Sequence, residues 1–308
     1  MKRIAAIIIF AAVSFQAFAQ GTAMDFIRAD RNPATMGLAG AGYASLSSGS
    51  AFSAFSNPAV IPLSEKTLHA AGAFGLMPSG EGKASVFGGA ASMKFGSMGV
   101  GLGYIGSSYP EIPLSSEGGG ASGTFTPKDM MLGVGLSFAA GDNLSFGAVA
   151  RYATQALDNK TTLKSISADI MALYRLDALS ISAGVVGIGP KVESVSNRKY
   201  PLPASAKLAA AYKLGFGDFS ADLMADADYF FSGNFGAAAG AQLSYKDMAF
   251  LRTGYRYSGA KADFTVAPVP SHFSIGAGAK LYGITLDAAF LIGGAATGTM
   301  AFSLGYSF

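Results

Sequence analysis

Few side chains in this chain could carry out acid, base, nucleophilic or metal chemistry. It contains two histidines, His69 and His272, and no cysteine. A histidine-centred triad would have to combine one of them with a serine and an acid from adjoining strands. Neither histidine lies in the H-x-x-x-H or H-E-x-x-H arrangement that holds zinc. We therefore predict no catalytic residue, no metal site and no cofactor, and do not expect an enzyme. The lack of cysteine also excludes disulfide scaffolds.

Glycine-rich strings at residues 99–103 and 133–135 could be mistaken for phosphate-binding loops. They lack the G-x-G-x-x-G spacing, and no helical pattern follows them. Glycines that line a crowded interior explain both strings more simply. The formal net charge of +3 is small and scattered along the chain, so binding to nucleic acid is not expected.

Charged residues within otherwise apolar segments are the most informative polar groups. Asp222, Asp226 and Asp228 share one face of a predicted strand, opposite Leu223 and Tyr229. A charge facing lipid near the bilayer midplane costs about 2–4 kcal/mol for Arg or Lys, so these groups should face an interior lumen. The predicted lumen network comprises Arg151, Asp169, Asp222, Asp226, Asp228, Arg252 and Arg256. Two roles stay open. The charges pair with one another and with the N-terminal segment, or Arg252 or Arg256 meets the carboxylate of an amphipathic ligand.

These side chains need a scaffold, and the composition indicates a sheet embedded in a membrane. Charged residues make up 13% of the chain and apolar residues 50%, against roughly 25% charged in soluble domains. After the N-terminal leader, no segment offers the roughly 18 uninterrupted apolar residues that a transmembrane helix requires. A closed sheet can instead pair every backbone amide inside a bilayer. The 41 glycines, 23 phenylalanines and 13 tyrosines suit a crowded lumen and aromatic girdles.

Alternation of bulky apolar and small residues predicts strands along most of the chain. In the last segment Phe302, Leu304 and Tyr306 fall on one face, and Ser303 and Gly305 fall on the other. Similar segments are predicted near 66–77, 82–95, 97–107, 128–139, 143–153, 163–176, 178–188, 202–214, 217–229, 235–246, 248–258, 271–281, 283–292 and 298–308. Short and long connections alternate between them, as in barrels with short periplasmic turns and longer outer loops. The sequence thus predicts an all-β fold, a transmembrane antiparallel β-barrel of about fourteen strands in the outer membrane of a Gram-negative bacterium.

The chain is predicted to have three parts. Residues 1–19 have the charged start, apolar run and A-x-A ending of a cleaved signal peptide. Residues 20–64 are expected to form a short N-terminal plug, and residues 65–308 the barrel. The plug motif consists of Gly37, Gly40, Gly42, Asn57, Pro58 and Ala59. These residue types suit tight backbone packing and helix ends rather than strands.

Two strings in the plug, MGLAGAG at 36–42 and FSNPA at 55–59, resemble the N-terminal signature of the FadL-like superfamily of long-chain fatty-acid transporter barrels. The segments YPLP at 200–203, LRTGY at 251–255 and FSIGAG at 273–278 resemble the PorV/PorQ branch found in Bacteroidota. The resemblance covers essentially the whole chain after the signal peptide. It implies a barrel of fourteen strands with an N-terminal plug and, for the PorV and PorQ branch, a role in type IX secretion.

The resemblance also implies partners. PorV-like members bind the C-terminal sorting domains of exported proteins, and PorQ-like members anchor a partner at the surface. We accordingly predict an outer-membrane barrel that acts as a shuttle or anchor in a type IX-like secretion or envelope assembly complex. The candidate docking patch is the apolar loop cluster Phe264, Val266 and Val269.

The alternative function is FadL-like transport of hydrophobic or amphipathic small molecules, with a lipid-like ligand in the lumen. Outer-membrane lipid is an expected partner in both cases. An open diffusion porin is disfavoured, because the inward faces carry few charges and a plug would block flow.

Overall fold

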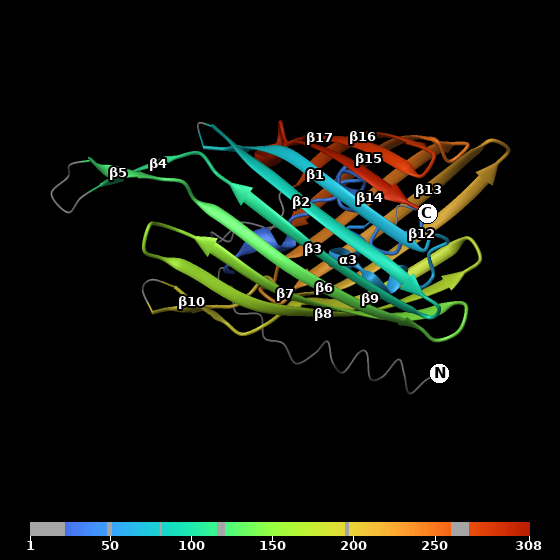
Figure 1. The fold of residues 1–308 in the computed structure, drawn as a ribbon, viewed down its shortest axis with the longest axis horizontal. Helices are drawn as coiled ribbons and strands as arrows, with labels where there is room; N and C mark the ends of the chain where they lie inside the picture. The colour runs from blue at the N-terminus through green and yellow to red at the C-terminus, as the bar shows by residue number, and fades with distance from the viewer. Residues whose placement is uncertain (1–21, 48–50, 81, 116–120, 195–196, 260–270) are drawn as a thin grey trace.

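Fourteen antiparallel strands close into a barrel in the computed structural model, which confirms the predicted fold (Figure 1). The structure describes residues 22–308 except 48–50, 81, 116–120, 195–196 and 260–270. Each wall strand pairs with its neighbours along the chain, and β1 pairs with β18 to close the sheet. The wall consists of β1 (Leu68–Ser79), β2 (Gly82–Phe95), β3 (Met98–Ser108), β6 (Lys128–Ala139), β7 (Leu144–Ala156), β8 (Thr162–Leu176), β9 (Leu179–Ile188), β12 (Ser205–Phe216), β13 (Phe219–Phe230), β14 (Phe235–Tyr245), β15 (Ala249–Gly259), β16 (His272–Leu281), β17 (Ile284–Ile292) and β18 (Met300–Ser307).

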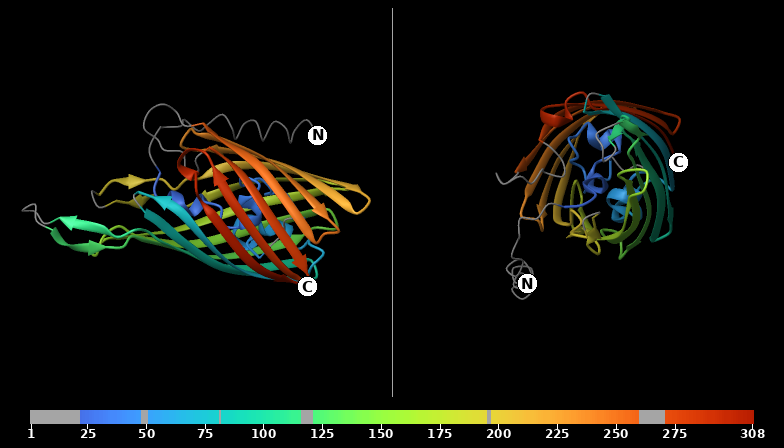
Figure 2. Two further views of the ribbon diagram at one scale, coloured as in Figure 1. Left: turned by 90° about the horizontal axis from the view of Figure 1, so that it is seen from above. Right: turned by 90° about the vertical axis from the view of Figure 1, so that its left-hand side faces the viewer.

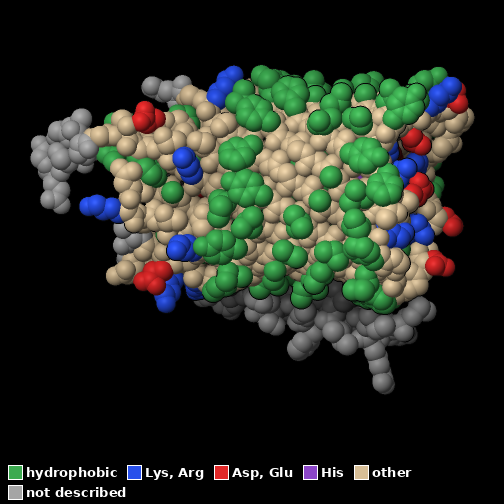
Figure 3. Space-filling model, viewed as in Figure 1, with side chains coloured by type: hydrophobic (Ala, Val, Ile, Leu, Met, Phe, Trp, Pro, Cys, Tyr) green, Lys and Arg blue, Asp and Glu red, His purple; other side chains and the backbone are tan. Residues whose placement is uncertain are grey.

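The period-2 pattern sorts side chains to the two faces of the wall. On β6, Leu132, Leu136 and Phe138 are about half exposed, whereas Gly133 and Gly135 between them are buried against the lumen. The same division recurs on the other strands and leaves a band of apolar side chains on the outside of the barrel (Figure 3). Such a band matches the hydrocarbon core of a bilayer.

The two ends of the barrel differ in their connections. At the tight-turn end, the strands are joined through residues with positive φ such as Gly96, Asp177, Gly217 and Gly283. The long-loop end carries the connections at residues 109–127, 157–161, 189–204 and 260–271. The short β1–β2 turn also lies at the long-loop end, so the alternation of lengths is not complete. By the usual arrangement of outer-membrane barrels, the tight-turn end is periplasmic and the long-loop end is extracellular.

Two of the long loops contain hairpins that the alternation in the sequence did not predict. Strand β4 (Ile112–Ser115) pairs with β5 (Ala121–Phe125), and β10 (Val192–Glu193) pairs with β11 (Lys199–Tyr200). The β4–β5 hairpin reaches well beyond the rim of the barrel (Figure 1). These strands are too short, and too rich in polar residues, to show a period-2 pattern.

The segment before β1 passes through the lumen from the long-loop end to the tight-turn end (Figure 2). Near its start, the amide of Ala23 donates to the carbonyl of Pro201 at 2.9 Å, and near its end Nζ of Lys94 donates to the carbonyl of Ser64 at 2.9 Å. Its short helices are η1 (Asp25–Arg28), α2 (Pro33–Met36), α3 (Ser53–Ser56) and η2 (Pro58–Val60), and η3 (Gly294–Ala296) precedes β18. None of the helices in the described part of the chain is long and apolar enough to cross a membrane.

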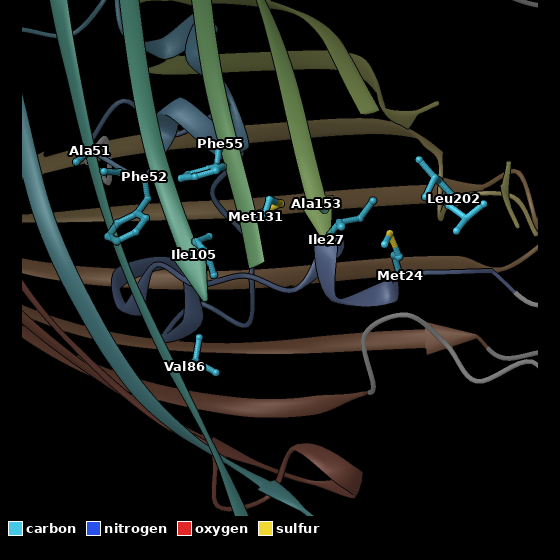
Figure 4. Packing of buried hydrophobic residues seen from close by; sticks show 12 residues of the cluster. Met24, Ile27, Ala51, Phe52, Phe55, Val86, Ile105, Met131, Ala153 and Leu202 are labelled. Carbon is cyan, nitrogen blue, oxygen red and sulfur yellow. The ribbon is translucent and has the colours of Figure 1, made fainter. Parts of the chain in front are cut away.

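The largest apolar core lies between this plug and the wall (Figure 4). Phe55 of α3 packs its ring against Gly103 on β3 and Gly133 on β6, and a Cβ atom at either glycine would overlap the ring. Phe52 joins the same cluster. The glycine strings of β3 and β6 therefore make room for the plug.

Candidate functional site

One side of the lumen is polar, where the plug meets β12–β15. The carboxylate of Asp228 is fully buried and forms ion pairs with three cations. Arg28 of the plug approaches Oδ1 at 2.9 Å, Lys207 of β12 approaches Oδ2 at 3.1 Å, and Arg256 of β15 approaches Oδ2 at 2.9 Å. A single carboxylate thus ties the plug to three strands of the wall.

The other two acids on β13 also hold the plug. Asp226 accepts the backbone N–H groups of Gly42 and Tyr43 at 3.1 and 3.3 Å. Asp222 accepts the hydroxyl of Ser47 at 2.9 Å. Because successive inward positions advance along one strand, the three acids contact the plug at three levels of the lumen.

The two arginines of β15 are already paired with acids. Arg252 donates through Nη1 to Asp287 and through Nε to Gln242, both at 2.6 Å, and Arg256 pairs with Asp228. Both guanidinium groups are buried. A ligand carboxylate at either arginine would have to displace a buried acid, so this arrangement favours pairing within the protein over the ligand-binding role.

Arg151 and Asp169 form a second anchor on another part of the wall. Their bidentate contact joins β7 to β8 with N–O distances of 2.6 and 2.5 Å. Arg151 also donates to the backbone carbonyl of Phe55, and Asp169 accepts the amide of Gly187 at 2.7 Å. The pair therefore holds the plug at α3.

The plug motif residues lie at the two contacts between plug and wall. The Gly37–Gly42 part lies against β14–β16, where a Cβ atom on Gly37 would lie 3.0 Å from Cα of Gly276. Gly40 and Gly42 adopt positive φ values of 79° and 115°. Asn57 caps η2 by accepting the amide of Ala59 at 3.1 Å. Pro58 and Ala59 pack against Gly135 on β6 and Gly147 on β7.

Sequence reasoning missed four members of the polar network: Arg28, Lys207, Gln242 and Asp287. Lys207 shares the inward phase of Ser205, and Asp287 interrupts an apolar segment, so the rule that places strand charges in the lumen could have found both. Gln242 is uncharged and gave no such signal. Arg28 lies in the plug, where no periodicity shows which way a side chain points.

A small apolar pocket lies between the plug and the wall formed by β1, β2 and β18. Its volume is about 30 Å³, with Met36, Ala73, Gly75, Met77 and Ala301 among its lining residues. That is room for about two water-sized groups, whereas pockets for organic ligands usually hold about 300 Å³ or more. This pocket is therefore too small to hold an organic ligand as it stands.

Arg31 of the plug is the only charged residue lining this pocket within the described part of the chain. Its Nε atom is buried and has no hydrogen-bond partner there, and the guanidinium makes none of the ion pairs found among the described residues. Burial lowers the pKa of Arg31, whereas the nearby Tyr109, Asp129 and Asp30 raise it. The hydroxyl of Tyr109 donates a hydrogen bond to the carboxylate of Asp129 at 2.5 Å, so Asp129 is bonded to Tyr109 rather than to Arg31. Arg31 is thus a cation beside an apolar space.

Two groups of predicted residues remain, the histidines and the docking patch. His69 and His272 lie at or next to strand ends, and Nε2 of His69 lies 3.2 Å from Oγ of Ser64 at the end of the plug. The docking patch Phe264, Val266 and Val269 lies outside the described residues.

Several solved structures share this architecture. The Ralstonia pickettii toluene transporter TbuX has a TM-score of 0.61 and 11% identity, over 90% of this chain and 98% of that chain. The CymD monoaromatic hydrocarbon channel has a TM-score of 0.63 and 13% identity, over 90% of this chain and 97% of that chain. A Pseudomonas aeruginosa FadL homologue has a TM-score of 0.57 and 14% identity, over 90% and 98%. The chain has the FadL-like fold.

This FadL-like barrel has the apolar belt of an outer-membrane protein of Gram-negative bacteria. No protein-family model and no curated protein sequence matches the chain. The three structures are named as a transporter, a channel and a FadL homologue, and none is named as a secretion component. The narrower resemblance to the PorV/PorQ branch and its type IX secretion role stays a prediction.

Proposed function

We propose that the barrel carries hydrophobic or amphipathic small molecules across the outer membrane, and that they bind in the pocket beside Met36 and Arg31. The pocket is the observation on which this proposal rests, because it is apolar and lies on the extracellular half of the lumen, between plug and wall. The names of the similar structures, which include a toluene transporter and a monoaromatic hydrocarbon channel, support the same class of ligand.

The plug restricts how such a pocket can open. Displacing the plug as a whole would break the buried ion pair between Arg28 and Asp228, which costs several kcal/mol, and the hydrogen bond from Arg151 to the carbonyl of Phe55. Met36 and Met77 line the pocket with flexible side chains, and changing a methionine rotamer costs far less. Ligand entry therefore proceeds by local rearrangement of these methionines while the anchors of the plug stay in place.

Filling the pocket should block ligand binding without unfolding the barrel. In Ala73→Leu, three extra carbons point from β1 into a space of about 30 Å³. We expect binding of toluene or of a medium-chain fatty acid, measured by calorimetry in detergent, to weaken about tenfold or more, because overpacking costs about 1–3 kcal/mol. Ala70→Leu, on the lipid face of the same strand, should bind as the parent does. Equal binding by both variants would contradict the pocket assignment.

Arg31 should make the site favour ligands with an anionic head. Replacing it by Met keeps an unbranched side chain and removes the charge. A charge-assisted hydrogen bond contributes about 1.5–3 kcal/mol, so Arg31→Met should weaken decanoate binding by about 10- to 100-fold and leave decanol binding nearly unchanged. Titration of each ligand at pH 8 measures the difference. A parallel loss for both ligands would mean that Arg31 only shapes the pocket.

A second candidate function is the predicted binding of protein partners at the cell surface, as a shuttle or anchor in secretion or envelope assembly. The β4–β5 hairpin favours it, since it projects from the rim and exposes Ile112 and Pro113. The candidate docking cluster around Phe264 is not among the described residues. We rank this function below transport.

A further inference from the structure

Three wall lysines near the long-loop end point outward. At the long-loop end, Lys83 on β2, Lys128 on β6 and Lys164 on β8 are exposed and share the outward phase of lipid-facing residues on their own strands. We call these three residues the basic sector. At the tight-turn end, Lys94 on β2 instead has the inward phase and donates to the carbonyl of Ser64 in the plug.

The basic sector forms one row along the outer rim. Its three lysines occupy β2, β6 and β8, with β3 and β7 between them. Lys128 pairs across the sheet with Ser108 and Ala156. Lys83 lies two residues from Ser85, the other partner of Ser108, and Lys164 pairs with Thr154, two residues from Ala156, so each is displaced by two residues from the register of Lys128, in opposite directions. Since neighbouring strands are about 4.8 Å apart and each residue rises about 3.3 Å, successive lysines stand about 12 Å from one another.

No acid within the described part of the protein neutralises these lysines. None of the three takes part in an ion pair there. The loops at the same end of the barrel also carry exposed cations, and among the described loop residues these cations outnumber the acids. The loop cations are Lys160, Lys191, Arg198 and Lys199, and the acids are Glu111, Asp158 and Glu193. Figure 3 shows lysine and arginine side chains bordering the apolar band on its left, at the end of the β4–β5 hairpin.

The rest of the rim has a different chemistry. The outward positions at the long-loop ends of β13–β16 carry aromatic rings, namely Tyr229, Phe235, Tyr257 and Phe273, all about half exposed. Aromatic rings are usual at a membrane interface and need no charged partner. Among the described residues, the outward-facing lysines at the long-loop ends of the wall strands are therefore confined to β2–β8, which indicates a partner with negative charge on that side.

We infer that the basic sector binds the phosphate groups of glycolipids in the outer leaflet of the outer membrane. The outward phase directs the ammonium groups toward lipid headgroups at the edge of the apolar belt, rather than toward a protein above the rim. An ammonium group at this edge loses part of its hydration, and a phosphate oxygen supplies a charge-assisted hydrogen bond in its place. The inference does not depend on the proposed transport function.

The test compares lysine variants for binding of bis-phosphorylated lipid A. Each lysine near an anionic lipid surface contributes roughly a factor of five, so the triple variant Lys83→Gln, Lys128→Gln, Lys164→Gln should bind on the order of 100-fold more weakly in detergent micelles. The matched control is Lys66→Gln, Lys213→Gln, Lys246→Gln, which removes the same charge from the tight-turn end. It should bind as the parent does. Replacing the basic sector by arginine should preserve binding.

The outcomes separate the possible sources of binding. Heat-modifiable gel mobility first establishes that each variant is folded. Equal binding by the triple variant and its control would overturn the inference, as would undiminished binding of lipid A that lacks both phosphates. Equally tight binding of phosphatidylglycerol would also overturn it, because the sector would then recognise anionic lipid in general. Loss confined to the basic-sector variant and to phosphorylated lipid A supports it.

Discussion

Asp228→Asn should be among the most destabilising conservative substitutions in this protein. It keeps the shape of the side chain but removes the negative charge that Arg28, Lys207 and Arg256 share. Breaking a buried ion pair by removing one partner costs about 3–5 kcal/mol, because the remaining charge is buried without compensation. We expect the free energy of unfolding in urea, measured in detergent or lipid vesicles, to fall by about that amount.

The matched control uses an ion pair that lies at the surface. Asp218 in the β12–β13 turn pairs with Lys246 in the β14–β15 turn at 3.4 Å, and both side chains are about half exposed. Exposed pairs contribute about 0–1 kcal/mol, so Asp218→Asn should change stability little. Adding Arg28→Gln to Asp228→Asn removes one of the uncompensated cations, and the double variant should lose less than the sum of its parts. Strict additivity would show that Arg28 and Asp228 do not act together.

The wall of the barrel was predictable because a strand exposes its faces alternately to lipid and to lumen. Apolar residues on one face and small residues on the other give the sequence an alternating pattern, as in Phe302, Leu304 and Tyr306 of β18. The same alternation predicted that Asp222 and Asp226 face inward, and both are buried in the structure. Because the residues of a wall strand face lipid and lumen alternately, each can be assigned to one face without knowledge of its contacts.

The plug and the loop hairpins could not be predicted in the same way. Arg28 and Arg31 are three residues apart in the plug, yet one is paired with Asp228 and the other lies beside the apolar pocket. Their surroundings come from strands far away in the sequence, and no periodicity records them. The ligand-binding role predicted for Arg252 or Arg256 faces the same difficulty, because Asp287 and Asp228 already occupy these arginines.

The glycines of the inward faces show how sequence and structure inform each other. Composition predicts a crowded lumen, but only the structure shows which glycine meets which part of the plug. Gly240 and Gly254 lie against Leu38, whereas a Cβ atom on Gly89, on the lipid face of β2, would meet nothing nearer than the carbonyl of Ala71 at 3.6 Å. The first two glycines should resist any side chain, and Gly89 should accept one.

Gly254→Val should therefore displace the plug. A Cβ atom at this position would overlap the backbone carbonyl of Leu38, which cannot rotate away as a side chain would. Overpacking of this kind costs about 1–3 kcal/mol, and here the strain falls on a contact between β15 and the plug. We expect lower stability toward urea together with faster uptake of a polar dye into vesicles that contain the variant. Gly89→Val adds the same side chain to the lipid face, so its stability and dye uptake should match the parent. If Gly254→Val were destabilised without leaking, the wall would absorb the strain, and the plug would be held in place by the Arg28–Asp228 ion pair and the hydrogen bond from Arg151 to the carbonyl of Phe55.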